Sequence, residues 1–383
     1  MDQQQIDTFR AQPVSAFSHL IDGKHVPASD GGTMDIISPI DGQVLTTTAK
    51  GTTADMEAAI ASARAAFEDG RWAGQPPAAR KKMLLKWADL IEANALELAV
   101  LGVRDNGTEI GMAIKAEPGS AAGTIRYYAE ALDKIYGEIA PTSSDILGMI
   151  HKEPVGVVGA IIPWNFPMMI GAWKLGPALA MGNSVVLKPS ETASLSLMRM
   201  CELALEAGLP SGVLNAVTGE GKVVGEAMGL SMDVDVLVFT GSGGTGRRLM
   251  EYAARSNMKR VYLELGGKSP NIVFADAPNL DEAAQVAAGG IFRNSGQVCV
   301  AGSRLLVEAS IHDDFVAAVA KATTQMRVGD PLSMETHIGA VNSEVQLKAN
   351  LRFVKTATSE GGKIALGGTQ ILQETGGYYM EPT

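Results

Sequence analysis

From residue 154 onward, short apolar runs alternate with helical patterns, and this alternation constrains the fold more than any other feature of the chain. Such alternation implies parallel sheets with helices on their faces, and these sheets bind ligands at the carboxyl ends of their strands. The strand-like runs are Gly156–Ile162, Ser184–Leu187, Val213–Val217, Val236–Phe239, Val261–Leu265, Asn271–Phe274 and Leu305–Glu308. The helical patterns are Ser194–Ala207, Val223–Met228, Thr245–Arg255, Asp281–Phe292 and Ile311–Met326. We therefore predict an α/β fold.

The first 150 residues are predicted to be mainly helical after one short hairpin. Asp22-Gly23 between two apolar pairs is a strong two-residue turn signal. Apolar spacing predicts helices over Thr53–Asp69, Ala78–Val103 and Ser120–Tyr136. The next segment, residues 137–152, is rich in turn residues and is predicted to be an excursion from the domain.

Composition excludes several classes of protein. At about 150 residues per domain, 383 residues predict two or three domains, and 46% hydrophobic residues exclude a disordered chain. The net charge of −10 argues against nucleic acid or an anionic membrane as the main partner. The most apolar stretch, Val155–Gly182, is interrupted by three prolines and a lysine, so we expect no membrane span.

The two cysteines, Cys201 and Cys299, are too few for a disulfide framework and predict a reducing compartment, the cytoplasm. No ligand cluster for a metal is apparent, so no metal is expected. Cys201 lies in an apolar helical pattern and is interpreted as a buried core residue. Cys299 lies among small residues and glycines, which suits an accessible nucleophile, although a buried thiol is the commoner case for a lone cysteine.

A glycine-rich motif follows one predicted strand. Gly241, Gly243 and Gly246 match G-x-G-x-x-G between a strand and a helix, where backbone N–H groups can approach a phosphate. A tight loop without a ligand is the alternative interpretation. Glu264 lies 18 residues beyond Gly246 (264 − 246), at the end of the next strand. This spacing fits an acid that holds a ribose, and it fits equally a general base aimed into a cleft.

Two other strand ends carry polar groups. Pro163 and Pro167 restrict the backbone around Asn165, whose amide can donate to an oxyanion; a structural turn is the alternative. Lys188 and Glu191 follow the next strand and can reach ribose hydroxyls, whereas a polar loop is the alternative.

Taken together, these segments resemble the aldehyde dehydrogenase superfamily. The matching motifs occur in the family's order along the chain: Pro163–Pro167, Lys188–Glu191, Phe239–Gly246, Glu264–Pro270 and Gly296–Arg304. A narrower similarity, to bacterial γ-glutamyl-γ-aminobutyraldehyde and guanidinobutyraldehyde dehydrogenases, rests on Glu130–Lys134, Ala140–Thr142 and Ser256–Val261. Gly243-Gly244 departs from the commoner Thr-Glu of the family.

The resemblance implies a role for each candidate residue. Cys299 would be the nucleophile, Glu264 the general base and Asn165 the oxyanion-hole amide, with Lys174 as a further catalytic residue. Lys188 and Glu191 would hold the adenosine ribose, and the Glu191 carboxylate would repel a 2′-phosphate, so NAD is favoured over NADP. The residues implied to contact NAD are Ile162, Pro163, Trp164, Lys188, Ser190, Glu191, Gly221, Gly225, Phe239, Gly241, Ser242, Gly246 and Leu265.

The same resemblance implies a route for a small-molecule aldehyde. Its lining would be Phe166, Ile170, Trp173, Ser120 and Phe292, with Glu117 near the mouth. Glu117 could pair with a cationic amino or guanidino group; a solvated carboxylate beside Pro118 is the alternative.

The implied architecture is a Rossmann-type NAD-binding domain, an α/β catalytic domain and a β-hairpin oligomerisation arm. We place the NAD-binding domain at residues 1–136 and 153–262, the arm at 137–152 and the catalytic domain at 263–383. The arm implies a homodimer or homotetramer. Family members extend beyond the position of Thr383. We therefore expect either an incomplete catalytic domain or, as the alternative function, a non-catalytic NAD-binding or oligomerising fragment.

Overall fold

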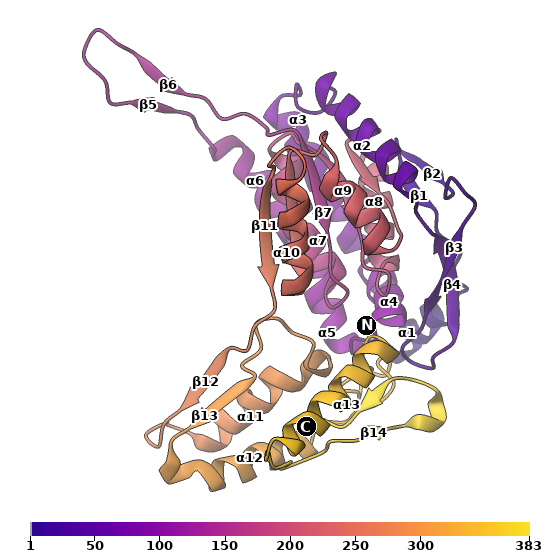
Figure 1. Ribbon diagram of the computed structural model, residues 1–383, viewed down its shortest axis with the longest axis vertical. Helices are drawn as coiled ribbons and strands as arrows, with labels where there is room; N and C mark the ends of the chain where they lie inside the picture. The colour runs from indigo at the N-terminus through magenta and orange to yellow at the C-terminus, as the bar shows by residue number, and fades with distance from the viewer. Residues whose placement is uncertain (1) are drawn as a thin grey trace.

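A twisted seven-stranded sheet forms the centre of the larger lobe in the computed structural model, which describes residues 2–383 (Figure 1). Its strands, in spatial order, are β11 (Arg260–Leu265), β10 (Val236–Gly241), β7 (Val157–Ile161), β8 (Ser184–Lys188), β9 (Leu214–Ala216), β1 (His19–Ile21) and β2 (Lys24–Val26). The first five are parallel, and β1 and β2 are antiparallel additions at one edge. The β1–β2 hairpin turns at Asp22-Gly23, both with positive φ, as the sequence predicts.

Helices cover both faces of this sheet, so its central strands are buried on both sides. In β7, Val158 and Ala160 pack into one core cluster, while Val157 and Ile161 pack into the other. One face is covered by α3 (Pro77–Ala93), α6 (Ser120–Ala131), α7 (Pro167–Ala180) and α8 (Leu195–Ala207). The other face is covered by α2 (Thr53–Glu68), α9 (Glu226–Leu230) and α10 (Gly243–Ala254).

A third core cluster lies beside the sheet, where the N-terminal helix meets the second lobe. It joins Ile6, Val103 and Ile110 to Leu332. The elements here are α1 (Gln3–Arg10), α4 (Ala95–Asn106), α5 (Ile110–Ile114), a π-helical turn (Lys115–Gly119) and the hairpin β3 (Thr33–Ile37) and β4 (Val44–Ala49).

The second lobe is smaller and follows β11 (Figure 1). A parallel pair, β12 (Pro270–Val273) and β13 (Arg304–Val307), packs with α11 (Leu280–Phe292) and α12 (His312–Thr324). The chain continues through α13 (Glu344–Ser359) to the short pair β14 (Gln370–Ile371) and β15 (Tyr379–Met380). Because β11 pairs along its whole length with β10, the sheet continues past the boundary that we predicted at residue 262.

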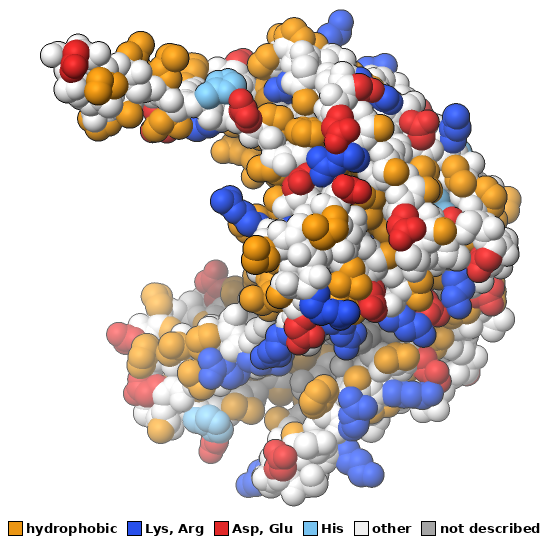
Figure 2. All heavy atoms as spheres, turned by 45° about the horizontal axis from the view of Figure 1, so that its top comes forward, with side chains coloured by type: hydrophobic (Ala, Val, Ile, Leu, Met, Phe, Trp, Pro, Cys, Tyr) orange, Lys and Arg blue, Asp and Glu red, His pale blue; other side chains and the backbone are white. Residues whose placement is uncertain are grey.

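A long hairpin projects from the larger lobe (Figure 1). Its strands are β5 (Glu138–Ala140) and β6 (Gly148–Ile150), and both lie within the predicted excursion, residues 137–152. Ile139, Leu147 and Met149 are 74%, 70% and 76% exposed. Figure 2 shows the hairpin as an extended projection with hydrophobic side chains along it, beside a hollow in the molecule.

Three local predictions differ from the structure. The helix predicted over Ala78–Val103 is two helices, which meet at Asn94. Residues 167–180 form a helix, α7, although no helix is predicted from the sequence within the proline-containing stretch Val155–Gly182; Pro167 occupies the first helical position, where the absent N–H costs nothing. The α-helix predicted to reach Tyr136 ends at Ala131. No helix within residues 2–383 combines the length and the apolarity needed to cross a bilayer.

Candidate active site

A cavity of about 400 Å³ lies at the carboxyl ends of β7, β8 and β10. The strand register explains its position, because Ile161 pairs with Lys188 on one side and with Phe239 on the other. The predicted cofactor residues that line it are Ile162, Pro163, Trp164, Lys188, Ser190, Glu191, Gly221, Gly225, Phe239, Gly241 and Ser242. Gly246 instead faces Leu265, where an added Cβ would lie 3.1 Å from Cδ2, so this pair lies in the contact between α10 and β11.

An ion pair forms one wall of this cavity. Lys188 Nζ lies 2.9 Å from Glu191 Oε1, and the Gly221 N–H donates to the same oxygen. The Lys188 side chain is 4% exposed; burial lowers the pKa of Lys188, and the charge of Glu191 opposes that shift. Among the hydrogen bonds of residues 2–383 none uses Glu191 Oε2, so this oxygen can accept from the hydroxyl of a ligand.

Another part of the cavity lining is suited to phosphate. Ser242 caps α10 by accepting from the Thr245 N–H, so the positive end of the helix dipole lies at the cavity. Lys222 and Arg248 also line it. A Cβ added at Gly241 would lie 2.4 Å from Phe239 Cζ, so the close approach at this turn requires glycine. The cavity lining thus combines cationic groups and a helix N-terminus with a free carboxylate oxygen of Glu191, which fit the phosphates and hydroxyls of a dinucleotide.

The loop before Cys299 has an unusual backbone. Asn294, Ser295 and Gly296 all have positive φ, of 49°, 53° and 75°. The left-handed region costs a non-glycine residue about 1 kcal/mol or more, so the surroundings must hold this loop in place. Cys299 is partly exposed, while Cys201 is buried in α8. The structure therefore separates the two thiols as predicted.

Asn165 contacts this loop directly. Its Nδ2 donates to the Gln297 carbonyl oxygen at 2.8 Å, and its Oδ1 accepts from the Phe166 N–H. An amide nitrogen has two hydrogens, so one remains for a ligand oxygen. The structure thus brings the predicted oxyanion-hole amide to within two residues of the predicted nucleophile.

Glu264 lies at the exposed end of β11. It lines a groove of about 470 Å³ together with Trp173 and Lys174, and Cys299 is not part of this lining. Burial lowers the pKa of Lys174, and the nearby charge of Glu264 opposes the shift. Glu264 and Lys174, both predicted to be catalytic, therefore line the same groove.

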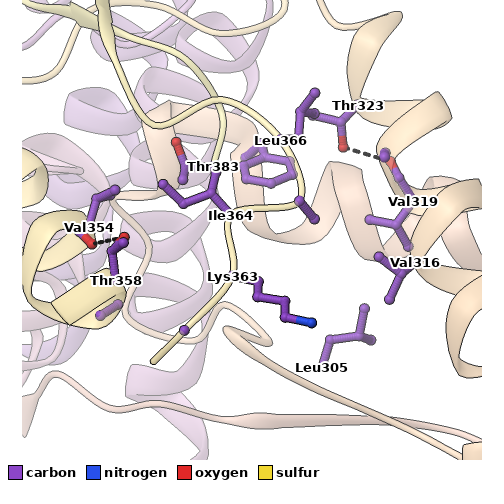
Figure 3. A pocket seen from close by; sticks show the side chains of 15 residues that line it. Leu305, Val316, Val319, Thr323, Val354, Thr358, Lys363, Ile364, Leu366 and Thr383 are labelled. Atoms are coloured by element: carbon purple, nitrogen blue, oxygen red, sulfur yellow. Dashed lines mark hydrogen bonds between the residues drawn. The ribbon is translucent and has the colours of Figure 1, made fainter. Parts of the chain in front are cut away.

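The predicted substrate residues are dispersed. Ser120 and Trp173 share a surface pocket with Tyr127 and Tyr128, whereas Phe166 and Ile170 are buried in the main core. The structure does not bring Phe292 to that pocket. It lines an apolar cavity of about 330 Å³ in the second lobe, which Figure 3 shows between Val316 and Val319 on one side and Ile364 and Leu366 on the other.

The prediction that Glu117 lies at a channel mouth is wrong. Glu117 is 4% exposed, and its Oε2 accepts from the backbone N–H groups of Met168 and Met169 in the first turn of α7. A buried carboxyl group in this position caps the helix and cannot meet a substrate cation in solvent.

Sequence reasoning missed a set of polar residues around the Cys299 loop, all of them buried except the partly exposed Gln297. These residues are Thr108, Glu109, Asn294, Gln297 and Asn342, and hydrogen bonds connect each of them to the loop or within it. The one local signal is Asn294-Ser295-Gly296, since asparagine and glycine adopt positive φ most readily. Within residues 2–383 no group of three or more His, Cys, Asp or Glu side chains is arranged to hold a metal ion.

A parallel sheet covered on both faces, with a phosphate-compatible cavity at its carboxyl ends, defines the class of dinucleotide-binding α/β proteins. A family model described as "Aldehyde dehydrogenase family" matches residues 25–383. The chain belongs to the aldehyde dehydrogenase family and is an oxidoreductase that acts on aldehydes. The predicted family and fold are confirmed.

Three relatives illustrate the similarity. The NADP/NAD-dependent aldehyde dehydrogenase PuuC of Escherichia coli K12 is 48% identical over 341 residues, which cover 89% of this chain and 69% of PuuC. Two solved structures each align with the whole of this chain at a TM-score of 0.97, and the alignment covers 77% of each solved chain. One is the γ-glutamyl-γ-aminobutyraldehyde dehydrogenase of Burkholderia cenocepacia J2315, at 46% identity. The other is a mutant of P. syringae AldA, an indole-3-acetaldehyde dehydrogenase, in complex with NAD+ and IAA, at 47% identity.

Proposed function

We propose that this chain oxidises its aldehyde through a covalent intermediate on Cys299. The observation that carries the proposal is the 2.8 Å hydrogen bond from Asn165 Nδ2 to the Gln297 carbonyl, which holds a partly buried amide from the β7–α7 connection against the loop of a partly exposed thiol. A nucleophile beside a pre-positioned donor is the arrangement that acyl-transfer chemistry requires.

The steps follow from the residues present. The Cys299 thiolate attacks the aldehyde carbon, and the resulting oxyanion accepts hydrogen bonds from Asn165 and from the Cys299 backbone N–H. The cavity lined by Lys188, Glu191 and Ser242 would hold NAD, which would supply the hydride acceptor; loss of hydride from the Cys299 adduct would leave a thioester on Cys299. Glu264 then takes a proton from water, which attacks the thioester and releases the carboxylic acid. Glu264 is exposed to solvent at the end of β11, so water reaches it.

The cofactor is NAD, and we propose that it is preferred over NADP. The cavity at β7, β8 and β10 offers Lys188 and Glu191 to a ribose and the α10 N-terminus to phosphate. A negative charge at Glu191 disfavours a 2′-phosphate by charge repulsion. Measuring kcat/KM with NAD and with NADP tests the preference, and equal values would remove the role given to Glu191.

We propose an amino- or guanidino-aldehyde of polyamine breakdown as the substrate. The support is the similarity to the γ-glutamyl-γ-aminobutyraldehyde dehydrogenase and the exposed aromatic residues Tyr127 and Trp173 at the Ser120 pocket, since aromatic faces attract cations. The similarly related AldA is named for an indole aldehyde, so a panel must include aromatic aldehydes.

We further propose that the hairpin arm, residues 137–152, joins subunits into a homodimer or homotetramer. Its exposed apolar side chains support this, because such a surface is stable in water only when it is covered. We also propose the cytoplasm as the compartment, which suits the two free thiols. The NAD-binding and catalytic domains, residues 1–136 with 153–262 and residues 263–383, remain a prediction.

The direct test is NADH formation, followed by absorbance, on a panel of aminoaldehydes, guanidinoaldehydes, aliphatic and aromatic aldehydes. We expect turnover that iodoacetamide blocks, with the highest kcat/KM for a cationic aldehyde. Turnover that survives complete alkylation of Cys299 would contradict the covalent mechanism. Equal kcat/KM across the panel would contradict the substrate class.

A further inference from the structure

The carboxylate of Glu109 lies at the N-terminus of one helix but bonds to a different segment of the chain. Glu109 precedes α5 and makes no side-chain cap to that helix. Both of its carboxylate oxygens instead accept from the Asn294 backbone N–H, each at 3.2 Å. Glu109 is 5% exposed and is separated from Asn294 by 185 residues, so this is a buried tertiary contact.

The Asn294 side chain joins three segments. Its Oδ1 accepts from the Thr108 hydroxyl at 2.8 Å, and its Nδ2 donates to the Asn165 carbonyl oxygen at 3.3 Å. Asn294 is 1% exposed, so its amide has no water to exchange with. The two bonds fix which way the amide points, with its oxygen toward Thr108 and its nitrogen toward Asn165.

The backbone of Asn294 and the loop after it complete the connection. The Asn294 carbonyl accepts from Gln297 Nε2 at 3.0 Å, and the Gln297 carbonyl accepts from Asn165 Nδ2. Gln297 Oε1 accepts from the Asn342 N–H, and Asn342 Nδ2 donates to Thr192, next to Glu191 of the dinucleotide cavity. These hydrogen bonds to Asn294 and Gln297 hold the left-handed turn that leads to Cys299.

We propose that Glu109 and Thr108 are positioning residues, which hold Asn294 in its left-handed conformation and thereby align the Cys299 thiol and backbone N–H with Asn165. This inference rests on the proposed function, in which Cys299 is the nucleophile. Neither residue is placed to touch substrate, and both act through Asn294.

The carboxylate offers this buried N–H two acceptors. The Asn294 N–H is a single donor that lies between two oxygens of Glu109. In Glu109→Gln one of the two acceptor oxygens is replaced by an NH2 donor, so the shared contact is reduced to one acceptor and the side chain must turn to present it. In Glu109→Ala the buried N–H has no acceptor, which costs more than losing the bond itself. We therefore expect Glu109→Ala to disturb the loop more than Glu109→Gln does.

The test uses the full chain and measures two rates separately. The first is the rate at which iodoacetamide labels Cys299, which mass spectrometry can identify; Cys201 is fully buried and serves as an internal reference. The second is NADH formation with an aldehyde substrate. For Glu109→Gln we expect labelling about threefold faster and kcat about tenfold lower, because a released loop exposes the thiol but misaligns it. Glu109→Ala should shift both rates further, in the same directions.

Thr108→Val removes the hydroxyl donor at nearly constant volume and should change both rates in the same directions as Glu109→Gln, but less. This variant keeps the test informative if Glu109→Ala does not fold. Asp55→Asn is the matched control, because Asp55 is also a buried carboxylate that accepts backbone N–H groups, but it caps α2. We expect Asp55→Asn to lower thermal stability with both rates unchanged.

Parental labelling rates in both Glu109 variants would overturn the proposal, as would the same labelling change in Asp55→Asn. A fall in kcat with slower labelling would also overturn it, since that result indicates a less reactive thiol. The proposed function fails separately, if the unaltered chain forms no NADH with any aldehyde. Labelling rates still report the position of the loop in that case.

Discussion

Glu117 and Met168 are joined by a hydrogen bond of 2.7 Å, from the Met168 backbone N–H to Glu117 Oε2, at the first turn of α7. The bond places a fully buried carboxyl group just after the segment that carries Asn165. Burial raises the pKa of Glu117 to about 8, against the opposing effect of the Met168 and Met169 N–H groups, and the nearby Asp105 adds to the rise. A buried cap of this kind makes stability depend on pH.

We predict that the free energy of unfolding falls between about pH 5 and pH 8 because of this group. The unfolded chain releases the Glu117 proton near pH 4.5, while the folded protein retains it until about pH 8. Within this window the folded state binds more protons, so each pH unit lowers stability by up to about 1.4 kcal/mol. Glu117→Gln removes this titrating group and should lose the part of the slope that Glu117 causes, while Asp105, whose pKa burial raises to about 7, still contributes below pH 7.

Urea unfolding at pH 5.5 and 8.5 measures the slope, and Glu57→Gln, at an exposed site on α2, is the control expected to keep it. If Glu117→Gln and the unaltered protein lost stability equally between these two pH values, Glu117 would not be the group responsible. Asp105, whose pKa burial raises to about 7, would then be the next residue to vary.

Cys299→Ala is predicted to abolish NADH formation while NAD binding persists. The thiol supplies the bond-forming atom, but it does not line the cavity at β7, β8 and β10. Steady-state absorbance and calorimetric titration with NAD measure the two properties. Cys201→Ala is the matched control: it removes a buried thiol from α8, so it should lower stability by about 1 kcal/mol and leave turnover intact. Measurable turnover by Cys299→Ala would rule out the nucleophile assignment.

Glu264→Gln is predicted to form the thioester at a normal rate and to hydrolyse it about 10²-fold more slowly, because the amide cannot take a proton from water. Rapid mixing should show a burst of NADH followed by a slow steady state, and mass spectrometry should detect the acyl-enzyme. A normal steady-state rate would contradict the role of Glu264 as general base. Its position beside Lys174 in the shared groove would then be structural only.

The sequence predicts well those features that depend on local pattern. Apolar runs predicted all five parallel strands of the large sheet to within two residues at each end. In β7, β8 and β9, which are buried on both faces, the hydrophobic signal is continuous. The residues around the dinucleotide cavity could likewise be predicted, because strand ends and glycine turns are visible in sequence. The break at Asn94 was missed, since both helices have the same apolar spacing.

Long-range partners were not predictable in the same way. Nothing near Glu117 indicates that its carboxyl caps a helix 50 residues later, so a charged residue beside a proline was read as exposed. The link from Glu109 to Asn294 spans 185 residues and depends on both being buried. α7 was missed because its prolines read as helix breakers, although Pro167 lies at the position where proline is tolerated.

Met149→Glu is predicted to dissociate the oligomer. Met149 is 76% exposed on β6, and a carboxylate buried in an apolar interface would lack a partner, which costs several kcal/mol. Light scattering coupled to size-exclusion chromatography measures the mass. Met258→Glu is the control, because Met258 is 81% exposed but lies outside the arm, so its mass should not change. If Met149→Glu keeps the parental mass, or if the unaltered chain is already a monomer, the hairpin does not join subunits.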